Sequence, residues 1–256
     1  MTVRKADMTG GTTKPVCLIT GVGDATGAAL ARRFAAGGYR VAMLARSESR
    51  LRSLEQDIPD SRVYPCDVSD LPALMETVDK MRSEMGTPTV LIHNAVAHSF
   101  ETFLDADPAL LERNFRVNTT SLLYLARALA PDMIREGHGA IMVTGNTASH
   151  RGVPHYALFA PTKAAQRILA ESLARELGPK GIHVGYVTID AAIDVTWLGD
   201  ETDRPPWLVP PADWPWPRED YFAKPDAIAD EVFHLAHQDR STWSFDLVIR
   251  PFAECW

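Results

Sequence analysis

Cysteine is scarce in this sequence, and the few cysteines are not spaced as structural sites. Only Cys17, Cys66 and Cys255 occur among 256 residues. Their spacing matches neither a disulfide framework nor a zinc site, which favours buried or terminal thiols. We therefore expect no metal site and a reducing compartment.

Long apolar runs and an excess of basic charge are absent as well. No stretch approaches the roughly 18 apolar residues of a membrane-spanning helix, and no segment repeats with the period of a solenoid or propeller. The formal net charge is -7, without a basic stripe that would bind nucleic-acid phosphates or anionic lipid. These absences exclude nucleic acid and membranes as partners and favour a cytoplasmic protein.

The first 14 residues carry no targeting signal. They are polar and rich in threonine and glycine, without an apolar segment or a cleavage site of small residues. We expect a flexible tail over residues 1–14. The remaining length, with 46% hydrophobic residues overall, suits one domain over residues 15–256.

Short apolar runs alternate along the chain with longer segments of helical period. This alternation is typical of parallel strands joined by crossover helices. It predicts a Rossmann-like doubly wound parallel sheet of about seven strands, with helices on both faces. The expected strands are 16–20, 41–45, 62–64, 89–92, 140–143, 183–187 and 245–249, and the expected helices are 27–37, 48–58, 71–85, 113–135, one reaching 177, and 225–236.

Proline and tryptophan crowd together between about residues 197 and 224. The prolines exclude a regular helix there. A long irregular insertion in a compact domain is usually a lid or a disordered segment, and the tryptophans favour a packed substrate lid.

A turn of small residues, Thr20 to Gly27, separates the first expected strand from its helix. A helix N-terminus offers unpaired N–H groups and the positive end of a dipole, so a diphosphate binds there without a basic side chain. The position between strand and helix favours a dinucleotide site over a merely structural turn. The expected cofactor-binding residues here are Gly21, Asp24, Ala25, Thr26 and Gly27.

The end of the second strand reads Ala45-Arg46-Ser47. An acidic residue at this place would bind a free ribose 2′-hydroxyl. Arg46 instead offers donors to a 2′-phosphate, with Ser47 beside it and Arg50 one helical turn later. We expect NADP to be preferred; the alternative is a solvated arginine.

These motifs resemble the short-chain dehydrogenase/reductase family over nearly the whole chain. That family carries T-G-x-x-x-G-x-G at the first turn, where Gly21 and Gly27 match and Ala25 replaces the middle glycine. Many of its NADP-using members have a basic residue where this chain has Asp24, so NAD remains an alternative cofactor. The resemblance implies further cofactor contacts from Asp67 and Val68 at the adenine, from Asn94 and Ala95 at the N-N-A-G motif, and from Ile193 at the nicotinamide amide.

The resemblance also implies a catalytic set, of which two members are altered. The family uses a serine, a Y-x-x-x-K pair on a helix, and a helix asparagine in a proton relay. Lys163 matches the lysine, which binds the nicotinamide ribose, and Asn118 matches the asparagine. Phe159 stands in place of the tyrosine, and Asn146 in place of the serine.

A phenyl ring has no proton to deliver, so the ordinary acid is missing. Tyr156 is a candidate replacement, against the alternative that it is a packing residue. Asn146 still offers a hydrogen bond to a substrate oxygen. A substrate that needs no proton from tyrosine, such as an iminium ion or a conjugated acceptor, would suit Phe159.

The leading hypothesis is therefore an NADP-preferring oxidoreductase that transfers hydride to or from a small, partly apolar substrate. The alternative is a catalytically silent dinucleotide-binding protein, a sensor or assembly partner. A third interpretation is cofactor-free chemistry in the same cleft. The resemblance implies a homotetramer or homodimer built on helices 113–135 and 163–177.

Overall fold

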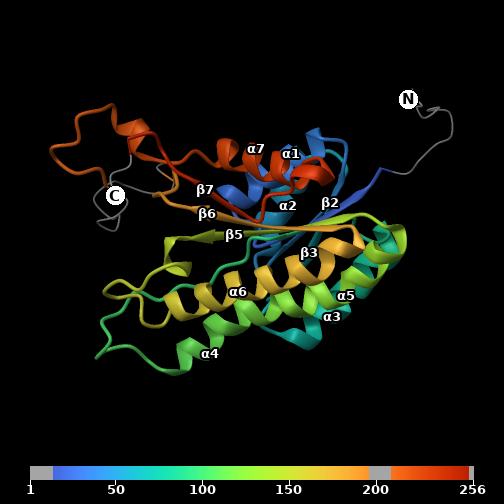
Figure 1. Ribbon diagram of the computed structural model, residues 1–256, viewed down its shortest axis with the longest axis horizontal. Helices are drawn as coiled ribbons and strands as arrows, with labels where there is room; N and C mark the ends of the chain where they lie inside the picture. The colour runs from blue at the N-terminus through green and yellow to red at the C-terminus, as the bar shows by residue number, and fades with distance from the viewer. Residues whose placement is uncertain (1–13, 196–208, 254–256) are drawn as a thin grey trace.

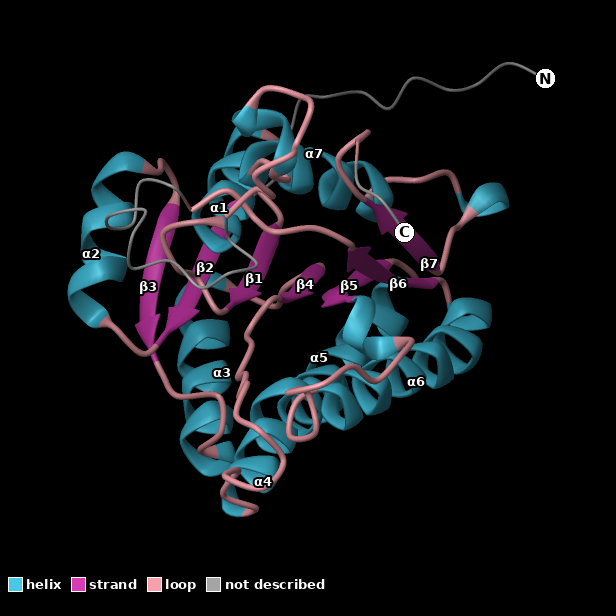
Figure 2. Ribbon diagram, turned by 90° about the vertical axis from the view of Figure 1, so that its left-hand side faces the viewer, coloured by secondary structure: helices cyan, strands magenta, loops and turns pink. Residues whose placement is uncertain are grey.

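A seven-stranded, wholly parallel sheet runs through the centre of the part of the chain that the structure describes (Figures 1 and 2). The structure is a computed structural model and describes residues 14–195 and 209–253. The strand order is β3-β2-β1-β4-β5-β6-β7, which confirms the predicted doubly wound sheet. The strands are β1 (Val16–Thr20), β2 (Arg40–Ala45), β3 (Ser61–Pro65), β4 (Val90–His93), β5 (Gly139–Asn146), β6 (Ile182–Ile189) and β7 (Asp246–Ile249).

Helices cover both faces of the sheet, as Figure 2 shows. One face is packed by α1 (Thr26–Ala36), α2 (Glu48–Asp57) and α7 (Pro225–Ala236), and the other by α3 (Leu71–Met85), α5 (Ser121–Glu136) and α6 (Ala160–Leu177). The short helix α4 (Ala109–Phe115) contacts α6. Each face has its own apolar core. The inner strands are buried on both faces. Their sequences are therefore continuously apolar instead of alternating between apolar and polar residues.

The helix α3 illustrates why the local prediction succeeds. Its buried residues, Leu74, Val78, Met81 and Met85, recur every three or four positions, which places them on one face of a helix. The Asp70 carboxylate accepts a hydrogen bond from the backbone N–H of Ala73, which caps the start. These local signals place both ends of α3 where the sequence predicts them.

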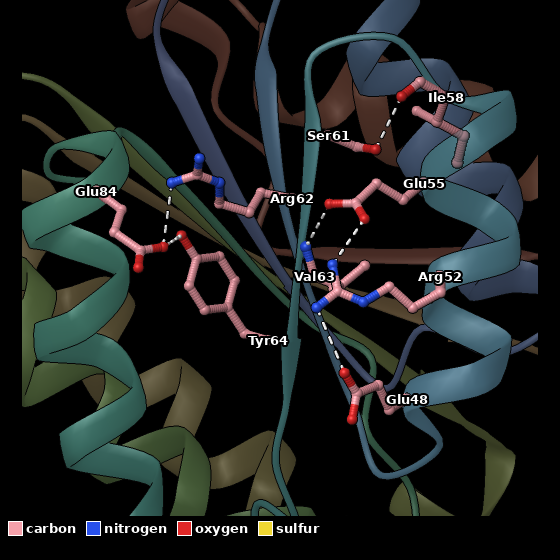
Figure 3. A network of polar contacts seen from close by, with 9 residues as sticks. All are labelled: Glu48, Arg52, Glu55, Ile58, Ser61, Arg62, Val63, Tyr64 and Glu84. Atoms are coloured by element: carbon pink, nitrogen blue, oxygen red, sulfur yellow. Dashed lines mark hydrogen bonds and ion pairs between the residues drawn. The ribbon is translucent and has the colours of Figure 1, made fainter.

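The edge strand β3 is held on both sides by polar side chains (Figure 3). Glu84 on α3 accepts hydrogen bonds from Arg62 (3.1 Å) and from the Tyr64 hydroxyl (2.9 Å). On the other side Glu55 of α2 accepts from the backbone N–H of Val63 at 3.2 Å and pairs with Arg52. Exposed contacts of this kind contribute little stability each, but together they fix β3 beside β2.

The prediction of a single long helix at 113–135 is wrong in one respect. The segment is divided into α4, a π-helical turn at Arg116–Thr120, and α5. A π turn lies between runs of ordinary helical bonds and often occurs at functional sites. Here the Asn118 carbonyl accepts hydrogen bonds from two buried side chains, Gln166 and His93, an arrangement that residue periodicity cannot reveal.

The described part of the proline-rich segment, residues 209–224, contains no α-helix, in agreement with its prolines. A short 3-10 turn, Arg218–Tyr221, is the regular element there. Trp214 packs edge-on against Tyr221 at 5.1 Å, and Trp216 against Phe252 at 5.4 Å between ring centroids. Three predictions fall outside the described residues. They concern positions 197–208 of the expected lid, positions 1–13 of the expected tail, and Cys255.

Within residues 14–195 and 209–253, none of the helices combines the length and apolar character that crossing a membrane requires. The same residues contain no cluster of three or more metal-ligating side chains. Cys17 and Cys66 are buried free thiols.

Candidate functional site

A cavity of about 860 Å³ lies at the carboxyl ends of the strands, where the strand order reverses between β1 and β4. Such a switch point is where open α/β sheets bind ligands. The wall contains every predicted cofactor-binding residue except Lys163: Gly21, Asp24, Ala25, Thr26, Gly27, Arg46, Ser47, Asp67, Val68, Asn94, Ala95 and Ile193. The fold thus brings residues from five separate segments into one cleft.

Close backbone packing explains two of the glycines in the first turn. Gly21 has a φ of +70, and a Cβ there would lie 2.5 Å from the Ala95 Cα atom. A Cβ on Gly27 would lie 2.6 Å from the Gly21 carbonyl oxygen. Gly23, by contrast, has no other atom within 4 Å of an added Cβ. The turn is therefore tight where it meets β4 and open at Gly23 on the cavity wall.

The N-terminus of α1 points polar groups into this cavity. The helix has no side-chain hydrogen bond at its N-cap residue, Ala25, so the first backbone N–H groups are available to an anion. The Thr26 hydroxyl is buried, with the residue 7% exposed, and has no hydrogen-bond partner. A buried hydroxyl without a partner calls for an explanation. A bound diphosphate would supply the missing hydrogen-bond acceptor. These residues fit the diphosphate of a dinucleotide.

Charged side chains gather at one end of the cavity. Arg46 is exposed on the wall and forms no salt bridge within the described residues, whereas Arg50 pairs with Asp24 at 2.9 Å. Arg50 therefore neutralises the acidic residue of the glycine turn instead of standing free. Arg113, which sequence reasoning missed because it lies inside a helical pattern, also reaches this wall.

Asp67 is a fixed anion beside these arginines. Burial raises its pKa, but two hydrogen bonds from Ser69, at 2.9 Å and 2.7 Å, and the positive charges of Arg46 and Arg113 outweigh that effect. The net result is a pKa below the ordinary value of a carboxyl. Two carboxylates, Asp24 and Asp67, among three arginines leave this end of the cavity with an excess of positive charge, which suits phosphate groups.

The opposite end of the cavity is uncharged. Its wall consists of Asn94 to His98 and Ile193, which pairs with Ala223 in an isolated parallel bridge. Val96 is 53% exposed there. Burial lowers the pKa of His98, although Glu101 opposes the effect, so His98 is neutral at pH 7. This end is uncharged and contains the apolar residues Val96 and Ile193, as a site for a partly apolar substrate would.

Asn118 lies beneath this end and ties three segments together. Its side-chain amide donates to the Ala97 carbonyl and to the Thr162 hydroxyl, each at 2.8 Å, and its oxygen accepts from the Ala97 backbone N–H at 2.9 Å. The side chain is fully buried. Asn118 therefore positions the loop after β4 against α6.

Lys163 is the predicted cofactor-binding residue that the structure places away from the cavity wall. It is 2% exposed, and its amine donates to the Thr144 carbonyl at 3.1 Å and to the Gln166 side-chain oxygen. The Thr144 hydroxyl in turn donates to Asn94, a residue of the wall, at 3.0 Å. One residue, Thr144, thus connects the amine to Asn94 on the cavity wall.

Phe159 and Tyr156 belong to a small aromatic cluster at the start of α6. Phe159 is 2% exposed and lies 5.7 Å from the rings of both Tyr156 and Phe100. Tyr156 is half-buried, and burial raises its pKa. Asn146, at the end of β5, is half-buried and its side-chain oxygen has no hydrogen-bond partner. None of these three residues lies on the cavity wall.

Comparison with known proteins agrees with this geometry. The family described as short chain dehydrogenase matches residues 15–196. The chain belongs to the short-chain dehydrogenase family. Membership places it among oxidoreductases that use a nicotinamide dinucleotide.

Individual short-chain dehydrogenases resemble the chain over most of its length. It is 27% identical to carbonyl reductase (NADPH) 2 of Sus scrofa, with 88% of this chain and 90% of the relative covered. It is 31% identical to D-erythrulose reductase of Gallus gallus, with 71% and 72% covered. A metagenomic short-chain oxidoreductase solved in complex with NADP is 26% identical, covers 93% of this chain and 97% of its own, and superposes with a TM-score of 0.77.

Proposed function

We propose that this short-chain dehydrogenase is an NADP-preferring enzyme that transfers hydride to or from a small, partly apolar substrate. The observation that carries the proposal is the division of one cavity into a charged end, with Arg46, and an uncharged end at Ile193. A bound nicotinamide dinucleotide supplies the hydride chemistry. The likeness to a structure solved with NADP and to an NADPH-dependent reductase supports the cofactor preference.

The chain's own residues take these roles in the proposal. Thr26 and the N-terminus of α1 bind the diphosphate, Asp67 and Val68 flank the adenine, and Asn94 and Ala95 support the ribose. Lys163 holds the nicotinamide ribose once it turns from Gln166, and Asn146 orients the substrate with its side-chain amide. Exposed apolar residues on α5 and α6 (Leu123, Tyr124 and Ile168) support a homodimer or homotetramer.

Phe159 stands, in this proposal, where relatives use a proton-donating tyrosine. Its ring is packed against Phe100 and Tyr156, and it has no exchangeable proton. An acceptor that becomes a stable product by hydride addition alone, such as an iminium ion, fits this site. The alternative is a dinucleotide-binding protein without catalysis, which the inward position of the Lys163 amine favours.

Cofactor preference is tested by the substitution Arg46→Ala. Because Arg46 has no salt bridge to lose within the described residues, its removal should weaken NADPH binding by ~10-fold or more, the size of one charge-assisted hydrogen bond. NADH binding should change by less than about twofold. Nicotinamide fluorescence titrations measure both affinities.

Arg50→Ala serves as the control for that experiment. Arg50 is engaged with Asp24, so its loss should weaken NADPH binding less than the loss of Arg46. Equal losses of NADPH and NADH affinity in Arg46→Ala would contradict a 2′-phosphate contact. Failure of the parent protein to bind either cofactor would overturn the proposed function.

The diphosphate contact is tested by Thr26→Val, which keeps the side-chain shape and removes the hydroxyl. Since that hydroxyl has no partner in the protein, thermal stability should stay the same or rise. NADPH affinity should fall by ~10-fold or more, the value of one hydrogen bond to a charged acceptor. The measurements are a fluorescence titration and a thermal unfolding curve.

The matched control is Thr242→Val, where the hydroxyl donates to the Asp239 carbonyl at 3.4 Å and the residue is not part of the cavity wall. It should leave NADPH affinity unchanged. Lower stability with unchanged affinity in Thr26→Val would mean that the hydroxyl has a structural role instead.

A further inference from the structure

A histidine faces the uncharged end of the cavity and has no role in the proposed function so far. Among the described wall residues of this end, Asn94 to His98 and Ile193, only His98 has a titratable side chain. The residue is exposed to solvent. Within the described part of the chain, neither ring nitrogen has a hydrogen-bond partner in the protein. The imidazole is therefore free to exchange a proton with a substrate.

The backbone on both sides of His98 is held by two buried asparagines. Asn118 accepts from the Ala97 N–H at 2.9 Å and donates to the Ala97 carbonyl at 2.8 Å. Asn114, which is 1% exposed, donates from its amide nitrogen to the Ser99 hydroxyl at 3.1 Å. The residues before and after His98 are thus each fixed by a side chain from the helical segment 109–120.

The imidazole itself is held by an aromatic stack. Its ring lies on Phe100, with 4.9 Å between the centroids and 23° between the planes. Phe100 in turn packs against Tyr156 at 5.0 Å and against Phe159 at 5.7 Å. Stacking covers one face of the imidazole and leaves its edge, with the two nitrogens, open to the cavity.

Asn114 also fixes the far side of this stack. Its amide nitrogen donates to the Leu158 carbonyl at 2.9 Å, and Leu158 directly precedes Phe159. The contact holds α4 beside the start of α6 (Figure 1). One buried side chain thereby positions both the loop that carries His98 and the rings that support it, as a group that acts on a substrate requires.

The surroundings of the imidazole keep it neutral at pH 7. Burial of the ring lowers the pKa of His98, and the opposing charge of Glu101, in the same loop, does not cancel that effect. Even with an ordinary pKa of about 6.5, histidine is mostly neutral above pH 7. The other titratable groups on the elements around this end are Arg113 on the cavity wall, His93 buried in β4, and the half-buried Tyr156 and Asp194.

We propose that His98 is the general base of this site, accepting the hydroxyl proton of a small alcohol while the hydride of that alcohol passes to the oxidised nicotinamide. The inference rests on the proposed function and deepens it for the direction in which hydride leaves the substrate. The O–H and C–H bonds break and the C=O π bond forms. The hydride carries its electron pair to the nicotinamide, and the proton bonds to an imidazole nitrogen.

His98 supplies what Phe159 cannot, because a phenyl ring accepts no proton. The exposed edge of the imidazole returns the proton to water after each turnover. A neutral imidazole accepts a proton but has none to give to a ketone oxygen at the nitrogen that faces it. The site therefore favours alcohol oxidation at pH 7, and ketone reduction stays slow.

The imidazole is first observed in the full-length protein without turnover. The chain has eight histidines, whose ring signals are followed by NMR after 15N labelling, and His98→Gln assigns one of them. That signal should titrate below the ordinary histidine value of about 6.5. In the presence of NADPH, which cannot accept hydride, cyclohexanol should shift the His98 signal because its hydroxyl donates to the ring.

Activity gives the second measurement. His98→Gln should lower kcat/KM for NADP-dependent oxidation of cyclohexanol, at about pH 8, by ~10²–10⁴-fold, the usual contribution of a positioned base. In the parent protein kcat/KM should fall as the pH drops through the NMR midpoint of His98, because a protonated imidazole accepts no proton. Added imidazole should restore part of the activity of His98→Ala.

His138→Gln is the matched control. His138 is an exposed histidine just before β5 and is not part of the cavity wall. The same substitution there should leave cyclohexanol oxidation and its pH dependence unchanged, and cyclohexanol should not shift the His138 signal.

The outcomes separate the inference from the proposed function. Failure of the parent protein to bind NADPH overturns the proposed function. If NADPH binds, the inference is overturned by a His98 signal that cyclohexanol does not shift, or by a folded His98→Gln variant with parental kcat/KM. A kcat/KM midpoint that differs from the His98 NMR midpoint overturns it too. So does a parent protein that oxidises none of cyclohexanol, benzyl alcohol and isopropanol.

Discussion

The double variant Phe159→Tyr, Asn146→Ser should reduce a small ketone with NADPH ~10²–10⁴ times faster than the parent protein, the usual contribution of a positioned acid. The new tyrosine would stand one helical turn before Lys163, whose backbone N–H donates to the Phe159 carbonyl at 3.2 Å. A spacing of four places both side chains on one face of α6. The new serine at the end of β5 would supply a hydroxyl donor for the substrate oxygen.

The comparison of the double variant with the parent protein also needs the two single variants and a control for the parent's own ketone activity. Phe159→Tyr alone should give most of the gain, because the missing proton lies at that position. Tyr156→Phe should leave the low ketone activity of the parent unchanged if Tyr156 only packs against Phe100 (5.0 Å). A double variant that binds NADPH yet gains no activity would favour the catalytically silent alternative.

Gly21→Ala should be the most destabilising single substitution proposed here, with a loss of more than ~3 kcal/mol in the free energy of unfolding. The new Cβ would lie 2.5 Å from Ala95 Cα and 2.6 Å from its nitrogen. Both are backbone atoms of the segment after β4, so neither can move alone. The φ of +70 adds a cost of about 1–2 kcal/mol for a residue with a side chain.

Urea unfolding and thermal denaturation measure this loss, which should lower the melting temperature by ~10 °C. Gly23→Ala is the matched control, since an added Cβ there meets nothing within 4 Å. It should fold with nearly parental stability. If Gly21→Ala were as stable as Gly23→Ala, the contact between the turn and β4 would be looser than the structure has it.

Much of the fold follows from local patterns. The ends of β1, α3 and α7 agree residue for residue with the prediction, because apolar period and capping residues act over a few neighbours. The strand β4 is shifted by one residue at both ends: it runs Val90–His93 instead of 89–92. Boundaries of this kind depend on which backbone groups find partners in the neighbouring strand, and these partners are distant in sequence.

The cofactor end of the candidate site was also predictable. Each predicted residue of the glycine turn and of the second strand end lies on the cavity wall, because motifs at strand ends meet at the same edge of a parallel sheet. Arg113 was not predicted, since nothing in its helical segment marks it. Arg50 was expected to support a phosphate, but it is engaged with Asp24.

The fold, the place of the cavity and the residues at its charged end follow from the amino-acid sequence, since period, turn chemistry and strand-end motifs are local properties. The position of the Lys163 amine and its surroundings depend instead on how distant segments pack. Gln166 lies one helical turn away, but Thr144, Asn118, His93 and Tyr186 come from other elements. Burial is a property of the packed molecule rather than of any short segment, so local patterns do not reveal it.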